Sequence, residues 1–202
     1  MIAKPFLTVT ACVAALMMAA CGAVRYPTYY ALNVAPAPKP AADDGRRPVA
    51  VAVRRFETPD YIRQGRIVYR ETPHEIGFYD YHRWADDPGA TITTAMIDAL
   101  RSARVFATVV PYDGQANQEC VLSGRLARLD EVDYGGGVRV ETRLVAELVN
   151  RRTGETLWTG EASESSNIET RTVASVVGAM SHALGTSIAR LIASMDQQVP
   201  RP

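Results

Sequence analysis

The chain has 202 residues, 47% of them apolar, and its 22 acidic side chains balance its 22 basic ones. This length and hydrophobicity predict one domain, or one domain with appendages, and they exclude a disordered tail. A net charge of zero provides no overall positive field to concentrate phosphate groups, so we expect no nucleic-acid partner. Only Lys4 and Lys39 are lysines, and both lie outside the segments that look folded, which excludes lysine chemistry in the core.

Residues 1–20 are typical of an export signal. One charge at Lys4 precedes an uncharged run that is too short to cross a membrane comfortably and that ends in small residues. Cys21 follows in the sequence MAAC, before Gly22, and this resembles the lipobox of bacterial lipoproteins. The resemblance predicts cleavage before Cys21, lipidation of its thiol, and a membrane reached through the lipid anchor. The alternative is a plain secretory signal that contains a cysteine.

The residue after Cys21 bears on localisation. Gly22 stands there rather than Asp, which in the proteobacterial sorting rule implies the periplasmic face of the outer membrane, with the inner membrane as the alternative. Residues 21–27 form the expected lipidated tether. If the short aromatic strand expected at 28–33 joins the sheet, the free part of the tether spans only about 20 Å. Cys120 has no disulfide partner once Cys12 leaves with the signal and Cys21 is lipidated, so we expect a buried thiol rather than a nucleophile.

The folded body is expected at 28–195, with a Pro-rich loop at 35–47 and a tail at 196–202. Residues 48–56 are apolar on both strand parities, which predicts a central strand covered on both faces. Two aromatic strands are predicted at 66–70 and 75–84. Asp87 as N-cap and Pro88 as the first helical residue predict a helix at 88–104, followed by a strand at 105–110.

Three further strands are predicted in succession, at 119–133, 137–149 and 155–164, joined by short turns as in an antiparallel meander. In the middle strand Leu144 lies on an apolar face and Arg139 on the opposite polar face. An amphipathic helix predicted at 169–195 would cover the sheet. The predicted fold class is therefore α/β, a single domain with a mixed, largely antiparallel sheet packed with two long helices.

Catalytic motifs are scarce in the sequence. His74 and His82 lie eight residues apart with no third ligand nearby, so we expect no metal site. The serines at 163, 165 and 166 lie outside any GxSxG elbow, so a serine hydrolase is not expected. We therefore expect no enzymatic activity and no cofactor.

Residues 59–85 carry a distinctive run. A proline–tyrosine–aliphatic turn precedes an aliphatic–valine–tyrosine–arginine strand, and an aromatic strand then closes on arginine, tryptophan and alanine: Pro59, Tyr61, Ile62, Ile67, Val68, Tyr69, Arg70, Tyr79, Tyr81, Arg83, Trp84 and Ala85. This run, after a lipobox and a short aromatic strand, resembles the ABC-type transport auxiliary lipoproteins. The resemblance covers about residues 28–195.

The resemblance implies a periplasmic lipoprotein that partners an ABC transporter and its mammalian-cell-entry (MCE) domain subunit. Such a system moves lipids or hydrophobic compounds between the inner and outer membranes, and this component would act by docking rather than by catalysis. Two alternatives stay open, a direct lipid carrier with an apolar cavity between sheet and helix, and an envelope scaffold for outer-membrane assembly. A homo-oligomer is compatible with each of them.

Six residues are candidates for partner binding, because aromatic and arginine side chains are enriched in interface cores: Tyr61, Ile62, Arg70, Tyr79, Arg83 and Trp84. Tyr61 and Ile62 are expected on an exposed turn. Trp84, just before a helix, could instead fill the core, and Arg70 could instead pair with an acidic neighbour.

Overall fold

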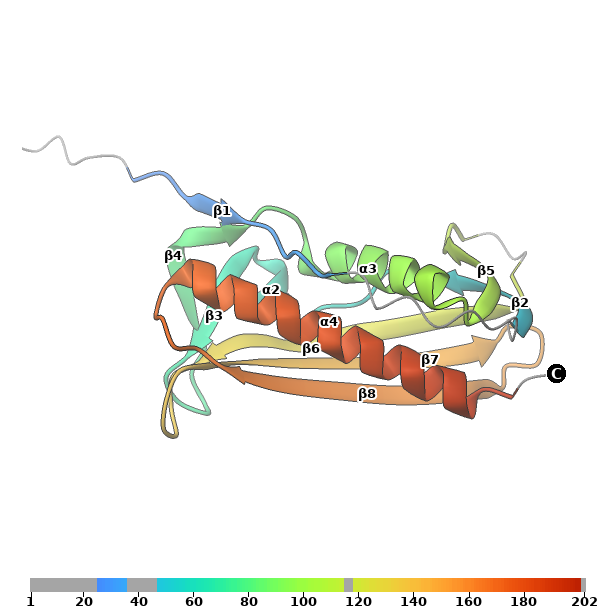
Figure 1. Ribbon diagram of the computed structural model, residues 1–202. Coiled ribbons are helices and arrows are strands. Elements are labelled where there is room, and N and C mark those ends of the chain that lie inside the picture. The colour runs from blue at the N-terminus through green and yellow to red at the C-terminus, as the bar shows by residue number, and fades with distance from the viewer. Residues whose placement is uncertain (1–24, 36–46, 115–117, 201–202) are drawn as a thin grey trace, which may run out of the picture.

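The computed structural model describes residues 25–35, 47–114 and 118–200 (Figure 1). Its strands are β1 (Thr28–Tyr30), β2 (Arg47–Val53), β3 (Arg66–Arg70), β4 (Gly77–Trp84), β5 (Phe106–Pro111), β6 (Cys120–Val132), β7 (Arg139–Asn150) and β8 (Thr156–Asn167). Its helices are α2 (Asp60–Arg63), α3 (Pro88–Ala103) and α4 (Val173–Gln198). The predicted signal, Cys21 and most of the Pro-rich loop lie outside the described residues.

The sheet is mixed and forks at β6. On one side of β6, β7 pairs antiparallel along almost its whole length, and β8 continues the meander on β7. On the other side, the start of β6 pairs in parallel with β2 and its end pairs in parallel with β3. The parallel strand β5 extends the β2 branch, and antiparallel β4 followed by parallel β1 extends the β3 branch. Figure 1 shows the two branches at opposite ends of the molecule. The α/β class with a mixed sheet and two long helices is confirmed.

The core lies between the sheet and α4, which runs along β7 and β8, while α3 packs beside α4 (Figure 1). Leu144 and Leu148 of β7 and Met180 and Leu184 of α4 are completely buried. The period-two pattern of β7 is confirmed, since the alternate side chains are more exposed. By length and composition α4 could cross a membrane, but 56% of its most apolar stretch is buried inside the fold, as in a core helix.

Two side-chain caps set where the helices begin. The Asp87 carboxylate accepts a hydrogen bond from the Ala90 N–H at 2.8 Å, and Pro88 opens α3 as predicted. The hydroxyl of Thr172 accepts from the Ser175 N–H at 3.2 Å, so α4 begins at Val173. The predicted start at residue 169 is therefore too early, because β8 continues to Asn167 and a short turn follows it.

The far end of α4 is held by Arg47, a contact that the sequence does not predict. Arg47 opens β2 and is only 2% exposed. Its guanidinium donates to the Asp196 carboxylate at 2.8 Å and to the Val199 carbonyl oxygen at 2.7 Å. A buried cation beside the last carbonyls satisfies acceptors that the helix leaves open and is favoured by the helix dipole. Helix α4 thereby extends to Gln198, into the segment that was expected to be a tail.

Candidate functional site

The predicted partner-binding residues lie on α2, β3 and β4, but two of them belong to the core. Ile62 is completely buried in the single turn of α2, so its expected exposure is wrong. The physical reason is that residues 60–63 form a helical turn, which directs Ile62 inward and leaves Tyr61 half-buried beside it. Trp84 is 5% exposed and fills the core. Neither Ile62 nor Trp84 is available as a surface anchor in this structure.

Arg70 forms a charged cluster with β6. Its Nε donates to Asp130 Oδ2 at 2.5 Å, and Arg128 Nε donates to the same oxygen at 3.0 Å. The Asp130 side chain is completely buried, and both guanidinium groups form ion pairs with it. The Arg70 guanidinium also lies 5.7 Å from the centre of the Tyr61 ring. The interpretation of Arg70 as a partner of an acidic neighbour is therefore confirmed.

This cluster continues across the outward surface of the meander. Arg128 pairs with Glu141, Arg139 pairs with the same carboxylate at 2.7 Å, and Arg143 pairs with Glu161 of β8 at 2.7 Å. We call this surface the polar face and define it by six side chains, of which only Asp130 is completely buried: Arg128, Asp130, Arg139, Glu141, Arg143 and Glu161. The side chains of β7 that pack on α4 point the opposite way, so α4 does not cover the polar face.

The polar face carries as many positive as negative side chains, and a hollow of about 390 Å³ lies on it beside Arg143 and Glu161. The ion pair of Arg143 with Glu161 holds the pKa of that carboxyl below its usual range. A balanced surface of fixed ion pairs suits a polar protein partner better than a phosphate backbone or an anionic membrane.

Tyr79 lies on β4, in the branch of the sheet that contains β3, and it is not an exposed anchor. Its O–H donates to Glu131 Oε2 at 2.8 Å, and its ring packs against Tyr69 with the centroids 5.2 Å apart. Burial is the main cause of the raised pKa of the Tyr79 hydroxyl, and the hydrogen bond to Glu131 raises this pKa further. Burial likewise raises the pKa of the Glu131 carboxyl. The pair therefore links β4 to β6 across the intervening strand β3.

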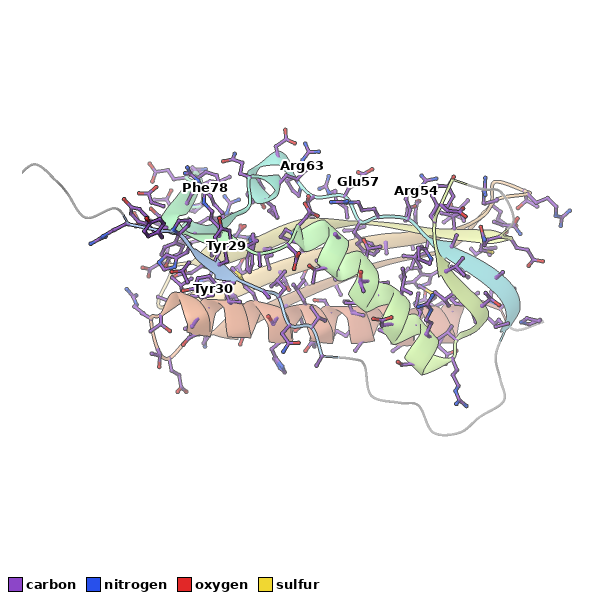
Figure 2. The ribbon with its side chains drawn as sticks, turned by 90° about the horizontal axis from the view of Figure 1, so that it is seen from above. Tyr29, Tyr30, Arg54, Glu57, Arg63 and Phe78 are labelled. Atoms are coloured by element: carbon purple, nitrogen blue, oxygen red, sulfur yellow. The ribbon has the colours of Figure 1, made fainter. Side chains whose placement is uncertain are left out.

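A second hollow, of about 350 Å³, lies where the sheet forks. Its lining includes Arg54, Glu57 and Arg125, and Figure 2 shows Arg54 and Glu57 on the same side of the molecule. Glu57 joins β6 through its backbone, because its N–H donates to the Gly124 carbonyl at 2.9 Å. A Cβ at Gly124 would come within 2.4 Å of the Phe56 ring, so β6 can pack this closely against Phe56 only with a glycine at position 124. The charged lining, three arginines and two glutamates, offers no evident catalytic set.

The described residues contain no group of three His, Cys, Asp or Glu side chains that could hold a metal ion. His82 instead lies 3.2 Å from the Tyr30 hydroxyl, and Cys120 is a buried free thiol, as predicted. Sequence reasoning missed Arg128, Asp130 and Glu141. The available signal was an aspartate inside the apolar run of β6, which in a buried strand requires a cationic partner.

Comparisons with known proteins agree on a family and a fold. The model of the family described as "ABC-type transport auxiliary lipoprotein component" matches residues 30–193. The crystal structure of protein XCC0632 from Xanthomonas campestris superposes with a TM-score of 0.73 at 18% identity, covering 85% of this chain and 96% of that one. A crystal structure of an uncharacterized protein gives a TM-score of 0.64 at 15% identity, covering 87% of this chain and 99% of that one. No curated protein matches in sequence.

Proposed function

Because the chain belongs to the family of ABC-type transport auxiliary lipoproteins, we propose that it is a lipid-anchored docking component of a system whose MCE-domain subunit it binds. In this proposal the system moves lipids or other hydrophobic compounds between the inner and outer membranes. The observation that carries the docking role is the polar face, a surface of paired charges next to Tyr61 that α4 does not cover.

The geometry of the polar face supports binding. Arg139 and Arg128 are each fixed on Glu141, so little side-chain freedom remains to be lost when a partner arrives. The long strands β6 and β7 form a rigid base, and α4 supports the meander by packing on the other face of β7 and β8. Tyr61 adds an aromatic side chain at the border of the charged surface, where arginine and aromatic groups favour protein contacts.

Cys21 is the proposed site of the anchor, and the periplasmic face of the outer membrane is the proposed location. The family description supports a lipoprotein. Labelled palmitate should be incorporated into the wild-type protein but not into Cys21→Ser, which should be released into the periplasm. Efficient labelling of Cys21→Ser would show that the lipid is attached elsewhere.

Photocrosslinking from the two faces of the molecule tests docking. A photoreactive residue at position 143 lies on the polar face, whereas one at position 182 lies on the exposed side of α4. In envelopes of the native host we expect crosslinks to the MCE-domain subunit from position 143 and few from position 182. The reverse pattern would place docking on α4, and crosslinks from neither position would contradict the docking proposal.

A direct lipid carrier is the second candidate, because a hollow of about 790 Å³ lies between residues 31–35 and the outer side of α4. Its lining is mostly small, with Ala31, Val177, Gly178 and Gly185 among its members. The interface between the sheet and α4 is itself filled by buried side chains, so a lipid would bind outside it. Stoichiometric bound lipid in the purified Cys21→Ser protein, which lacks the proposed covalent anchor, together with failed partner capture, would favour this candidate.

A further inference from the structure

The edge of the sheet at β1 exposes an unusual number of aromatic side chains. Among the described residues, five large apolar side chains are exposed, and three of them are Tyr26 (81%), Tyr29 (61%) and Tyr81 (44%). Strand β1 is the last strand of its branch and pairs only with β4 within the described part of the sheet. An uncovered edge with exposed aromatic groups invites association unless something covers it.

The register places these tyrosines together with arginines. Tyr29 pairs with Arg83 and Tyr30 with Trp84, and because Trp84 is buried, strand alternation directs Tyr29 and Arg83 to the outer side. The Arg25 guanidinium lies 5.7 Å from the centre of the Tyr81 ring. We call this surface the aromatic edge and define it by five residues: Arg25, Tyr26, Tyr29, Tyr81 and Arg83. Figure 2 shows Tyr29 at the same end of the molecule as Phe78 of β4.

The charge of the aromatic edge is positive. Arg25 and Arg83 both belong to it, and within the described part of the chain neither of them lies within ion-pairing distance of a carboxylate. The edge thus differs from the polar face, where each arginine has an acidic partner. Free guanidinium groups beside tyrosines suit phosphate-bearing headgroups at a membrane surface, where aromatic side chains also concentrate.

The length of the preceding chain restricts where the aromatic edge can lie. Four peptide steps separate Cys21 from Arg25, so a fully extended chain spans at most about 14 Å between them. If Cys21 carries the lipid, Arg25 cannot be farther than this from the headgroup region. A partner protein would have to fit into this narrow space, whereas the membrane itself is already there.

We infer that the aromatic edge rests on the headgroups of the membrane that holds the anchor, so that Tyr26, Tyr29 and Tyr81 enter the interface while Arg25 and Arg83 bind lipid phosphates. This inference rests on the proposed lipidation of Cys21. It orients the molecule with the β1–β4 branch toward the bilayer and the long β6–β8 meander extending from it.

Site-directed spin labelling tests this orientation in the mature lipoprotein, reconstituted in phosphatidylethanolamine and phosphatidylglycerol vesicles. One label replaces Tyr29, and a control label replaces Val145, which is 37% exposed on β7. Cys21 is blocked by its lipid in this proposal, and Cys120 is buried. We expect the label at position 29 to lose access to a water-soluble nickel reagent and to gain access to oxygen on reconstitution, while the label at position 145 stays aqueous.

A binding measurement without the anchor gives an independent readout. In the Cys21→Ser protein, Tyr26→Ser, Tyr29→Ser and Tyr81→Ser together should lower binding to the same vesicles about tenfold, because apolar and aromatic area at the interface is lost. Val145→Ser is the matched control and should leave vesicle binding unchanged. Thermal unfolding of each variant verifies that the fold is retained.

Three results separate this inference from the alternatives. A label at position 29 that stays aqueous in vesicles would overturn it. Protection of that label in lipid-free protein, rising with protein concentration, would show that a second copy covers the edge and would also overturn it. Membrane contact at position 29 without palmitate incorporation at Cys21 would refute the proposed anchor, while still supporting direct contact of the aromatic edge with lipid headgroups.

Discussion

At the scale of single residues, Arg47 is expected to contribute strongly to stability. Its removal in Arg47→Met would leave the carbonyl oxygens of Asp196 and Val199 and the Asp196 carboxylate without this donor. We expect the free energy of unfolding to fall by about 3 kcal/mol, measured by urea denaturation of the Cys21→Ser protein. Arg63→Met, at a 60% exposed side chain, should change it by less than about 0.5 kcal/mol. Equal losses would mean that the Arg47 bonds contribute nothing specific.

Glu131 predicts a dependence of stability on pH. Burial holds the pKa of its carboxyl above the ordinary value of 4.5, although the bond from Tyr79 acts in the opposite direction. The folded protein therefore keeps a proton that the unfolded chain has lost, and this contribution is fully present below pH 4.5 and lost as the pH rises through the raised pKa.

Glu131→Gln removes this titration and retains a hydrogen-bond acceptor for Tyr79. Relative to the wild type, we expect the variant to gain stability between about pH 4 and pH 7, with the difference growing as the pH rises. Urea denaturation at a series of pH values measures it. A difference that shrinks with rising pH would show that the bond from Tyr79 outweighs burial.

At the scale of elements, β7 separates core from surface on adjacent residues. Leu144 is completely buried against the core, whereas its neighbour Val145 is 37% exposed on the other face. Leu144→Ala should therefore cost about 2 to 5 kcal/mol of unfolding free energy, and Val145→Ala less than about 1 kcal/mol. Similar losses in chemical denaturation would mean that β7 is covered on both faces.

The elements that the sequence predicts well are those with a long, regular pattern. The alternation in β7 and the cap at Asp87 are local signals, and both appear in the structure as expected. The one-turn helix α2 has no such signal, because four residues are too few for a helical period. The sequence therefore gives no local signal that Ile62 is buried, although the run around it resembles the right family.

At the scale of the whole molecule, the fork of the sheet lay beyond sequence reasoning. The two branches meet β6 through parallel pairings of only a few residues, between segments far apart in the chain. The buried contacts that close this arrangement, Arg47 on α4 and Arg70 on Asp130, are equally non-local. Periodicity identifies which face of a strand is buried, but not which strand pairs with it. The sequence therefore indicates candidate residues such as Arg70 without indicating the residues that they contact.

Charge-reversal variants on the polar face should distinguish its contribution to docking from its contribution to stability. Arg143 of β7 and Glu161 of β8 form an ion pair between side chains that are 51% and 47% exposed. Arg143→Glu places two like charges side by side, and adding Glu161→Arg restores an ion pair of reversed direction. We expect the single variant to lose some thermal stability and the double variant to recover it.

Capture of the MCE-domain subunit should behave differently from stability. A partner that recognises a positive side chain on β7 and a negative one on β8 should bind both variants about tenfold more weakly than the wild type. The double variant restores stability but not this original charge pattern. Pull-down of the tagged proteins from detergent-solubilised envelopes measures this. Recovery of capture in the double variant would mean that the pair only supports the fold and that docking occurs on another surface.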